Sequence, residues 1–266
     1  MTERALSDAA RPPSQRLPGR NWPGRALRTG RPLLVGRARP WAGALAVGCV
    51  ALIVVPGVLF AHQRTADRLD HVIDAPIVTW FGGRQGLALW LVAPGSRVPA
   101  LAVSAVIVVA CLLAGRLNGA LLAAAALPVA EAVTEKLLKP MVDRTILGAV
   151  SYPSGHTTAI VALAATVTVL LLLVPPRPAW ARPARVLILA VAYALVIAVA
   201  VGLIGLRWHY FTDTVAGAAV GVGTVCGLAL ILDSRFIRRL LTLRGRVGDP
   251  SGRPGPSGRE YPERLR

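Results

Sequence analysis

The stretch Val186–Leu206, which reads VLILAVAYALVIAVAVGLIGL, contains no charged residue over 21 positions. An apolar α-helix of about 20 residues is what crosses the hydrocarbon core of a bilayer. Similar uncharged stretches run over Pro40–Gln63, Val98–Gly115, His156–Pro175 and Thr214–Leu232. A sixth, Leu117–Leu138, is uncharged as far as Glu131. The sequence therefore predicts an all-α polytopic membrane protein with a bundle of six transmembrane helices.

The composition excludes an ordinary soluble protein. Of the 266 residues, 54% are hydrophobic and only 16% are charged, and the mean hydropathy is +0.57. The apolar stretch Gln85–Ser96 is only 12 residues long and contains Pro94 and Gly95, so we expect it to be interfacial or re-entrant. Three cysteines, Cys49, Cys111 and Cys226, lie in apolar runs and are interpreted as small buried hydrophobic residues, not as a disulfide set.

The basic residues predict the orientation in the membrane. With both termini on one side, that side collects 22 of the 30 Arg and Lys residues and the other side 8. Because cytoplasmic segments of membrane proteins carry the excess of positive charge, we expect a protein of the plasma membrane with both termini on the cytoplasmic side. Residues 1–40 and 233–266 are rich in Arg, Pro and Gly, so we expect two disordered basic tails around a membrane domain at 41–232. Their charge favours orientation and contact with anionic lipids. Binding to nucleic acid is not expected, because no recognition motif accompanies the charge.

Polar side chains gather in three segments on the side opposite the termini. The first runs from Glu131 to Arg144 and contains both lysines of the chain, Lys136 and Lys139. The second is the hexapeptide Ser151–His156, and the third contains Arg207, His209 and Asp213. Charged groups at this depth are costly, which makes a functional site the default interpretation.

The residue types in these segments suit phosphoryl transfer. Lys139, Arg144 and Arg207 offer the positive charge and the donors that hold a phosphoryl group. Ser154 and Gly155 precede a predicted helix, whose free N–H groups also favour an anion. His209 and His156 could then act as nucleophile and acid. Asp213 follows His209 by four residues, so on a helix its carboxylate could accept from one ring nitrogen of His209.

These segments resemble the membrane branch of the type 2 phosphatidic acid phosphatase superfamily, which shares its catalytic core with the vanadium haloperoxidases. The family is marked by the motifs K-x6-R-P, P-S-G-H and S-R-x5-H-x3-D on a six-helix bundle. The second motif is complete as Pro153–His156, and His209–Asp213 matches H-x3-D. The resemblance, over roughly 41–232, implies that His209 forms a phosphohistidine, that Asp213 orients it and that His156 protonates the leaving group. It also implies that no metal or other cofactor is required.

Two arginines of the family pattern are displaced. Starting from Lys139, the Arg-Pro pair would fall on Ile146 and Leu147, and Arg144 stands two positions early. The Ser-Arg pair would fall on Gly202 and Leu203, whereas Arg207 stands two residues before His209. We expect Arg144 and Arg207 to reach the same phosphate from these shifted positions.

Other interpretations of the same residues stay open. Lys139 could pair with Glu135 at the i,i+4 spacing, and Pro153–Gly155 could be only a turn and helix cap. Asp213 could cap the last helix, with or without a catalytic role. His156, His209 and either Asp213 or Asp143 could also form a metal site with two histidines and one carboxylate, although the neighbouring cations would repel a metal.

The sequence therefore predicts an integral membrane phosphatase that hydrolyses a lipid phosphate or a polyprenyl diphosphate at the extracytoplasmic face. Its Arg- and Ala-rich composition suggests a bacterium, in which, by analogy with the family, undecaprenyl diphosphate would be a natural substrate. The alternatives are a lipid phosphotransferase and a non-catalytic binder or transporter of lipid phosphates. The sequence carries no signal for the oligomeric state.

Overall fold

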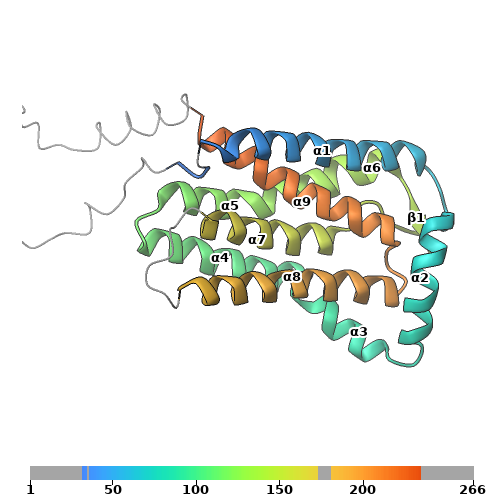
Figure 1. Cartoon of the computed structure of the whole chain (residues 1–266). Helices are drawn as coiled ribbons and strands as arrows, with labels where there is room; N and C mark the ends of the chain where they lie inside the picture. The colour runs from blue at the N-terminus through green and yellow to red at the C-terminus, as the bar shows by residue number, and fades with distance from the viewer. Residues whose placement is uncertain (1–31, 35, 173–180, 235–266) are drawn as a thin grey trace, which may run out of the picture.

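The computed structural model of the chain describes residues 32–34, 36–172 and 181–234, which are almost entirely helical (Figure 1). The predicted all-α fold is confirmed. The elements are α1 (Ala38–Leu59), α2 (Arg68–Phe81), α3 (Gln85–Val92), the 3-10 turn η2 (Ala93–Gly95), α4 (Arg97–Leu113), α5 (Leu117–Ala132), the π-helical segment η3 (Val133–Leu138), α6 (Lys139–Val142), β1 (Thr145–Ile146), β2 (Ala149–Val150), α7 (Gly155–Leu172), α8 (Ala181–Gly205) and α9 (Phe211–Leu232). The two strands form a small antiparallel hairpin in which Thr145 pairs with Val150.

Within the described residues, six helical stretches are long and apolar enough to cross a membrane, as the sequence predicts. Their bounds are Ala38–Leu59, Gln85–Leu113, Leu117–Val142, Gly155–Leu172, Ala181–Gly205 and Phe211–Leu232.

The second of these spans includes Gln85–Ser96, the stretch that the sequence predicts to be interfacial or re-entrant. In the structure this stretch forms helix α3 and the turn η2, which contact α8 and are separated from α4 by Ser96 in an extended conformation. Its interfacial or re-entrant position in a membrane stays a prediction. Pro94 and Gly95 produce the short 3-10 turn between the two helices instead of ending the span.

Helix α7 lies at the centre of the bundle and contacts α4, α5, α8 and α9 (Figure 1). Its contact with α9 is close because two glycines of α9 face it. A Cβ atom at Gly217 would lie 2.5 Å from the carbonyl oxygen of Ser154, and one at Gly221 would lie 2.8 Å from the amide nitrogen of Ala162. This close packing holds the first turn of α9 beside the segment that leads into α7.

Helix α2 was not predicted from the sequence. In Figure 1 it runs across the end of the bundle at which α8 joins α9. Two buried carboxylates attach it to the start of α9. Asp70 accepts a hydrogen bond of 2.8 Å from the amide of Thr212, and Asp74 accepts one of 3.2 Å from the amide of Phe211. Free N–H groups at a helix N-terminus are natural partners for carboxylates.

At the opposite end of the bundle, the first and the last described residues of the chain contact each other. The side chain of Asp233 is fully buried and accepts hydrogen bonds of 2.6 and 2.7 Å from the amides of Leu33 and Leu34. At the inner edges of the two expected tails, 1–40 and 233–266, α1 already begins at Ala38, and Asp233 binds the amides of Leu33 and Leu34. The rest of both predicted tails lies outside the described residues. Cys49, Cys111 and Cys226 are buried and free, as expected.

Candidate active site

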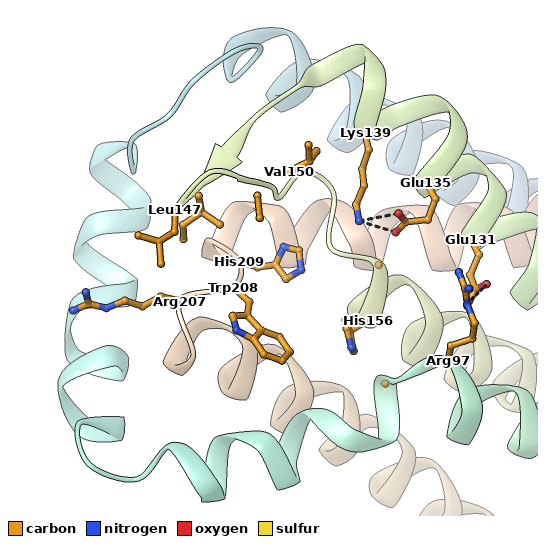
Figure 2. A pocket seen from close by; sticks show the side chains of 14 residues that line it. Arg97, Glu131, Glu135, Lys139, Leu147, Val150, His156, Arg207, Trp208 and His209 are labelled. Atoms are coloured by element: carbon orange, nitrogen blue, oxygen red, sulfur yellow. Dashed lines mark hydrogen bonds and ion pairs between the residues drawn. The ribbon is translucent and has the colours of Figure 1, made fainter.

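A cavity of about 550 Å³ opens at the end of the bundle that carries α2 (Figure 2). It lies between η2, the π-helical segment, the β-hairpin, the start of α7 and the loop from α8 to α9. Its lining residues are Gly95, Arg97, Glu131, Glu135, Lys139, Ile146, Leu147, Ala149, Val150, Gly155, His156, Arg207, Trp208 and His209. The structure thus brings together five of the eight predicted site residues: His209, His156, Lys139, Gly155 and Arg207. Asp213, Arg144 and Ser154 do not line the cavity.

His209 lies in the loop before α9, and its ring is almost buried at the cavity wall, with 8% of the residue exposed. Its Nδ1 atom is 2.8 Å from the carbonyl oxygen of Ser151. A carbonyl oxygen can only accept, so in the neutral ring Nδ1 donates this hydrogen bond and Nε2 keeps its lone pair. This tautomer is the one that a nucleophile attacking through Nε2 needs.

Asp213 does not orient His209 in the way that the spacing predicts. The His209 Nδ1 to Asp213 Oδ2 distance is 3.9 Å, which is too long for a hydrogen bond. The reason is local: α9 begins only at Phe211, so His209 lies outside the helix on which an i,i+4 pair would form. Asp213 instead accepts from the amide of Tyr210 in a capping box, the capping alternative that the sequence left open.

Arg144 also differs from its expected role in the phosphate clamp. Its side chain is fully buried behind the cavity, where it donates to Asp213 Oδ1 at 2.7 Å and to Asp70 Oδ2 at 2.5 Å. The same guanidinium donates to the hydroxyl of Thr212 at 2.7 Å. A buried guanidinium is stable only with such partners, and two carboxylates satisfy it better than an exposed cavity wall.

The backbone of Arg144 connects this cluster to His209. Its carbonyl oxygen accepts from the amide of Ser151 at 2.8 Å and from the hydroxyl of Ser151 at 3.3 Å. Ser151 in turn presents its own carbonyl oxygen to His209. The guanidinium lies over the rings of Phe60 and Tyr210, each 4.4 Å from Cζ to the ring centroid. Arg144 therefore supports the nucleophile from behind.

The first turn of α7 brings His156 into the cavity. Ser154, fully buried, accepts hydrogen bonds from the amides of Thr157 and Thr158 through its hydroxyl and carbonyl oxygens. Ser154 is therefore part of a helix cap. In the described part of the chain, the amides of Gly155 and His156 have no protein acceptor, so they remain for an anion at the N-terminus of α7. The indole of Trp208 lies beside His156, with ring centroids 6.2 Å apart.

Lys139 reaches the cavity from the end of the π-helical segment, but its charge is engaged. Its Nζ atom lies 2.7 and 2.9 Å from the two carboxylate oxygens of Glu135, which is the i,i+4 pair that the sequence left open. Gly155 faces this pair closely, since a Cβ atom there would lie 2.7 Å from Glu135 Oε1. A side chain at position 155 would push the pair away from α7.

Arg207 lines the cavity, yet its side chain points away from Lys139 and towards α2 (Figure 2). It has a positive φ of 57°, which turns the chain sharply at the end of α8. Arg207 also lines a second cavity of about 370 Å³ between α2 and the hairpin. The predicted convergence of Arg144, Arg207 and Lys139 on one point is therefore not present.

Three features of the site were missed by reasoning from the sequence. Arg97, at the start of α4, pairs with Glu131 at 3.8 Å on the cavity wall. Trp208 and the apolar hairpin also line the cavity, and the carboxylate of Asp70 on α2 binds Arg144. An isolated Glu131 in an apolar run was the one sequence signal for Arg97, because a charge at such a position requires a partner.

The alternative metal site has no counterpart in the described residues, which contain no group of three His, Cys, Asp or Glu side chains arranged to hold a metal ion. The two candidate carboxylates have other partners: Asp213 forms an ion pair with Arg144, and Oδ2 of Asp143 lies 3.6 Å from Nδ1 of His62.

A family model described as the PAP2 superfamily matches residues 132–237 of the chain. The matched segment contains all eight residues predicted for the site, from Lys139 to Asp213, but neither Arg97 nor the carboxylates of α2. No curated protein and no solved structure matches the chain.

Proposed function

We propose, from the premise that this chain belongs to the type 2 phosphatidic acid phosphatase superfamily, that it hydrolyses a lipid phosphate or a polyprenyl diphosphate through a phosphohistidine. Membership of this superfamily supports a phosphatase in general. The six helices that are long and apolar enough to span a membrane support a membrane protein. The observation that carries the finer proposal is the shared cavity of His209 and His156, with Nδ1 of His209 bound to a carbonyl oxygen.

In the first step, Nε2 of His209 attacks the terminal phosphorus in line with the leaving oxygen. The bond from phosphorus to that oxygen breaks, and His156 donates a proton to the oxygen where the leaving group is an alkoxide. In the second step, His156 accepts a proton from a water molecule, which attacks the phosphohistidine and releases inorganic phosphate. The ring of His209 then returns to its starting tautomer.

The charge on the phosphoryl oxygens requires donors in the cavity. The amides of Gly155 and His156 at the start of α7 supply two, and Lys139 supplies a third when the substrate competes with Glu135 for its ammonium group. Arg207 would join them after a rotation of its exposed side chain. Arg144, Asp213 and Ser154 act as positioning residues, because each holds backbone on which His209 or His156 depends.

The cavity would face the extracytoplasmic side of a bacterial plasma membrane. This placement rests on the distribution of basic residues, of which 22 of 30 lie on the side of the termini. The acyl or prenyl chain of the substrate would then lie in the outer leaflet beside the spans, with its headgroup in the cavity.

The test is release of phosphate from a panel of lipid phosphates and diphosphates by the purified protein in detergent, compared with its His209→Ala form. We expect turnover by the unmodified protein and loss of at least about a thousandfold in the variant, because the nucleophile is removed. Equal turnover by both proteins would overturn the proposal. A product that depends on an added alcohol, with little free phosphate, would indicate a phosphotransferase. Binding of a polyprenyl phosphate without turnover would indicate a non-catalytic binder.

A further inference from the structure

Two ion pairs of unequal strength line the cavity beyond His156. Lys139 is held tightly by both oxygens of Glu135, and 21% of its side chain is exposed. Arg97 is held loosely, because its Nε atom lies 3.8 Å from Glu131 and 73% of its side chain is exposed. Such an exposed pair contributes little to stability, so the guanidinium is available to another anion.

The position of Arg97 is fixed by the turn that precedes it. A Cβ atom at Gly95 would lie 3.1 Å from the carbonyl oxygen and 3.3 Å from the Cβ atom of His156. The turn η2 therefore packs directly against the start of α7, and Arg97 follows as the first residue of α4. In Figure 2, His156 lies between His209 on one side and Arg97 with Glu131 on the other.

This order matters for an in-line reaction. The nucleophile and the leaving oxygen lie on opposite sides of the phosphorus atom, so the leaving group of a phosphoryl group attacked by His209 extends past His156. In a lipid monophosphate this group is an alcohol. In a lipid diphosphate it is a second phosphate, which carries negative charge into the region of Arg97.

We propose that Arg97 binds the phosphate of the leaving group and makes the cavity selective for lipid diphosphates over lipid monophosphates. This inference rests on the proposed function. When the bond between the terminal phosphorus and the bridging oxygen breaks, the electron pair stays on the bridging oxygen and the lipid monophosphate leaves as an anion. Arg97 stabilises this charge by a charge-assisted contact, for which the guanidinium offers two parallel N–H donors, so the leaving group needs no proton from His156.

Arg97 and Glu131 lie outside the segment 132–237 that matches the family model. The selectivity is therefore assigned to this chain's own residues, on the loosely held pair between α4 and α5, and not to the motif residues around His209.

The experiment compares two substrates with the same prenyl chain, the monophosphate and the diphosphate, in detergent. For Arg97→Gln we expect kcat/KM for the diphosphate to fall about tenfold to a hundredfold more than for the monophosphate, the size of a lost hydrogen bond to a charged group. Glu131→Gln is the matched control, because it breaks the same ion pair but keeps the guanidinium. Glu131→Gln should preserve or raise the preference for the diphosphate. Arg97→Lys, which keeps the positive charge, should retain part of this preference.

The outcomes separate the two proposals. If Arg97→Gln and Glu131→Gln each lower kcat/KM equally for the monophosphate and the diphosphate, the ion pair is merely structural and the inference is wrong, while the phosphatase assignment stands. The inference is also wrong if the ratio of the two kcat/KM values is the same in Arg97→Gln as in the unmodified protein. If the unmodified protein turns over neither substrate, the proposed function fails, and the role of Arg97 fails with it.

Discussion

Asp74 couples the stability of the protein to pH. This carboxyl of α2 is 9% exposed and faces the amide of Phe211 at 3.2 Å. Burial, followed by the nearby charge of Asp70, raises the pKa of Asp74 from its ordinary 3.8 to about 7, although the Phe211 amide and Arg144 act in the opposite direction.

The sign of the effect follows from proton binding. Between pH 3.8 and about 7 the folded protein keeps the proton on Asp74 and the unfolded chain does not. Stability therefore falls as pH rises through this window, by about 1.4 kcal/mol per pH unit. Between pH 5 and pH 8 the loss is about 3 kcal/mol, and above pH 8 it does not grow.

The assay is thermal unfolding of the detergent-purified protein at pH 5 and at pH 8. Asp74→Asn removes the charge but keeps an oxygen for the Phe211 amide, so we expect it to unfold at a higher temperature than the unmodified protein at pH 8 and at a similar one at pH 5. Asp67→Asn is the control, since it removes a carboxylate next to the same helix at an exposed position. Parallel pH dependence in the unmodified protein and Asp74→Asn would refute the reasoning, because it would mean that Asp74 is already ionised in the folded state at pH 5.

Three further predictions test the packing and the buried charges. Arg144→Ala should destabilise the protein by about 3–5 kcal/mol, measured as a lower unfolding temperature, because two buried carboxylates lose their partner. Gly217→Ala should lower both stability and turnover, because its Cβ atom would meet the Ser154 carbonyl at 2.5 Å, whereas Gly227→Ala, with open space around it, should leave both unchanged. Asp233→Asn should lower the unfolding temperature, because its buried carboxylate accepts hydrogen bonds from two backbone amides of the N-terminal segment and forms an ion pair with Arg39 at 3.9 Å.

The membrane spans could be predicted from the sequence because each depends on a local property, the length of an uncharged apolar stretch. Uncharged stretches such as Val186–Leu206 predict spans because the hydrocarbon thickness sets their length. Helix α2 was not predicted because it is short, contains Pro76 and carries acidic residues that resemble a polar loop. Its formation depends on the start of α9, which offers free amides to Asp70 and Asp74, and no local pattern encodes that contact.

The candidate site shows the same division. The P-S-G-H and H-x3-D patterns correctly indicate that His156 and His209 share a cavity, because each motif sits at a helix start that the bundle brings to one end. The partners of the charged residues could not be predicted, because they depend on where α9 begins and on which carboxylates lie nearby. Arg144 is the clearest case: as the only Arg close to Lys139 it was expected in the cavity, but Asp70 offers it a buried partner.

The charged residues also explain why the number of cations in the sequence overstates the positive charge of the cavity. In the described chain, Lys139 and Arg97 each pair with a glutamate, while Arg144 is withdrawn behind His209. An isolated charge at membrane depth is costly, so a cavity without substrate is more stable when its cations have partners. On the proposed function, a phosphate gains a cation in addition to the amides at the start of α7 by competing with Glu135 or Glu131, and it gains most where the existing pair is weakest. That pair is Arg97 with Glu131, which is why we propose that Arg97 favours an anion with a second phosphate.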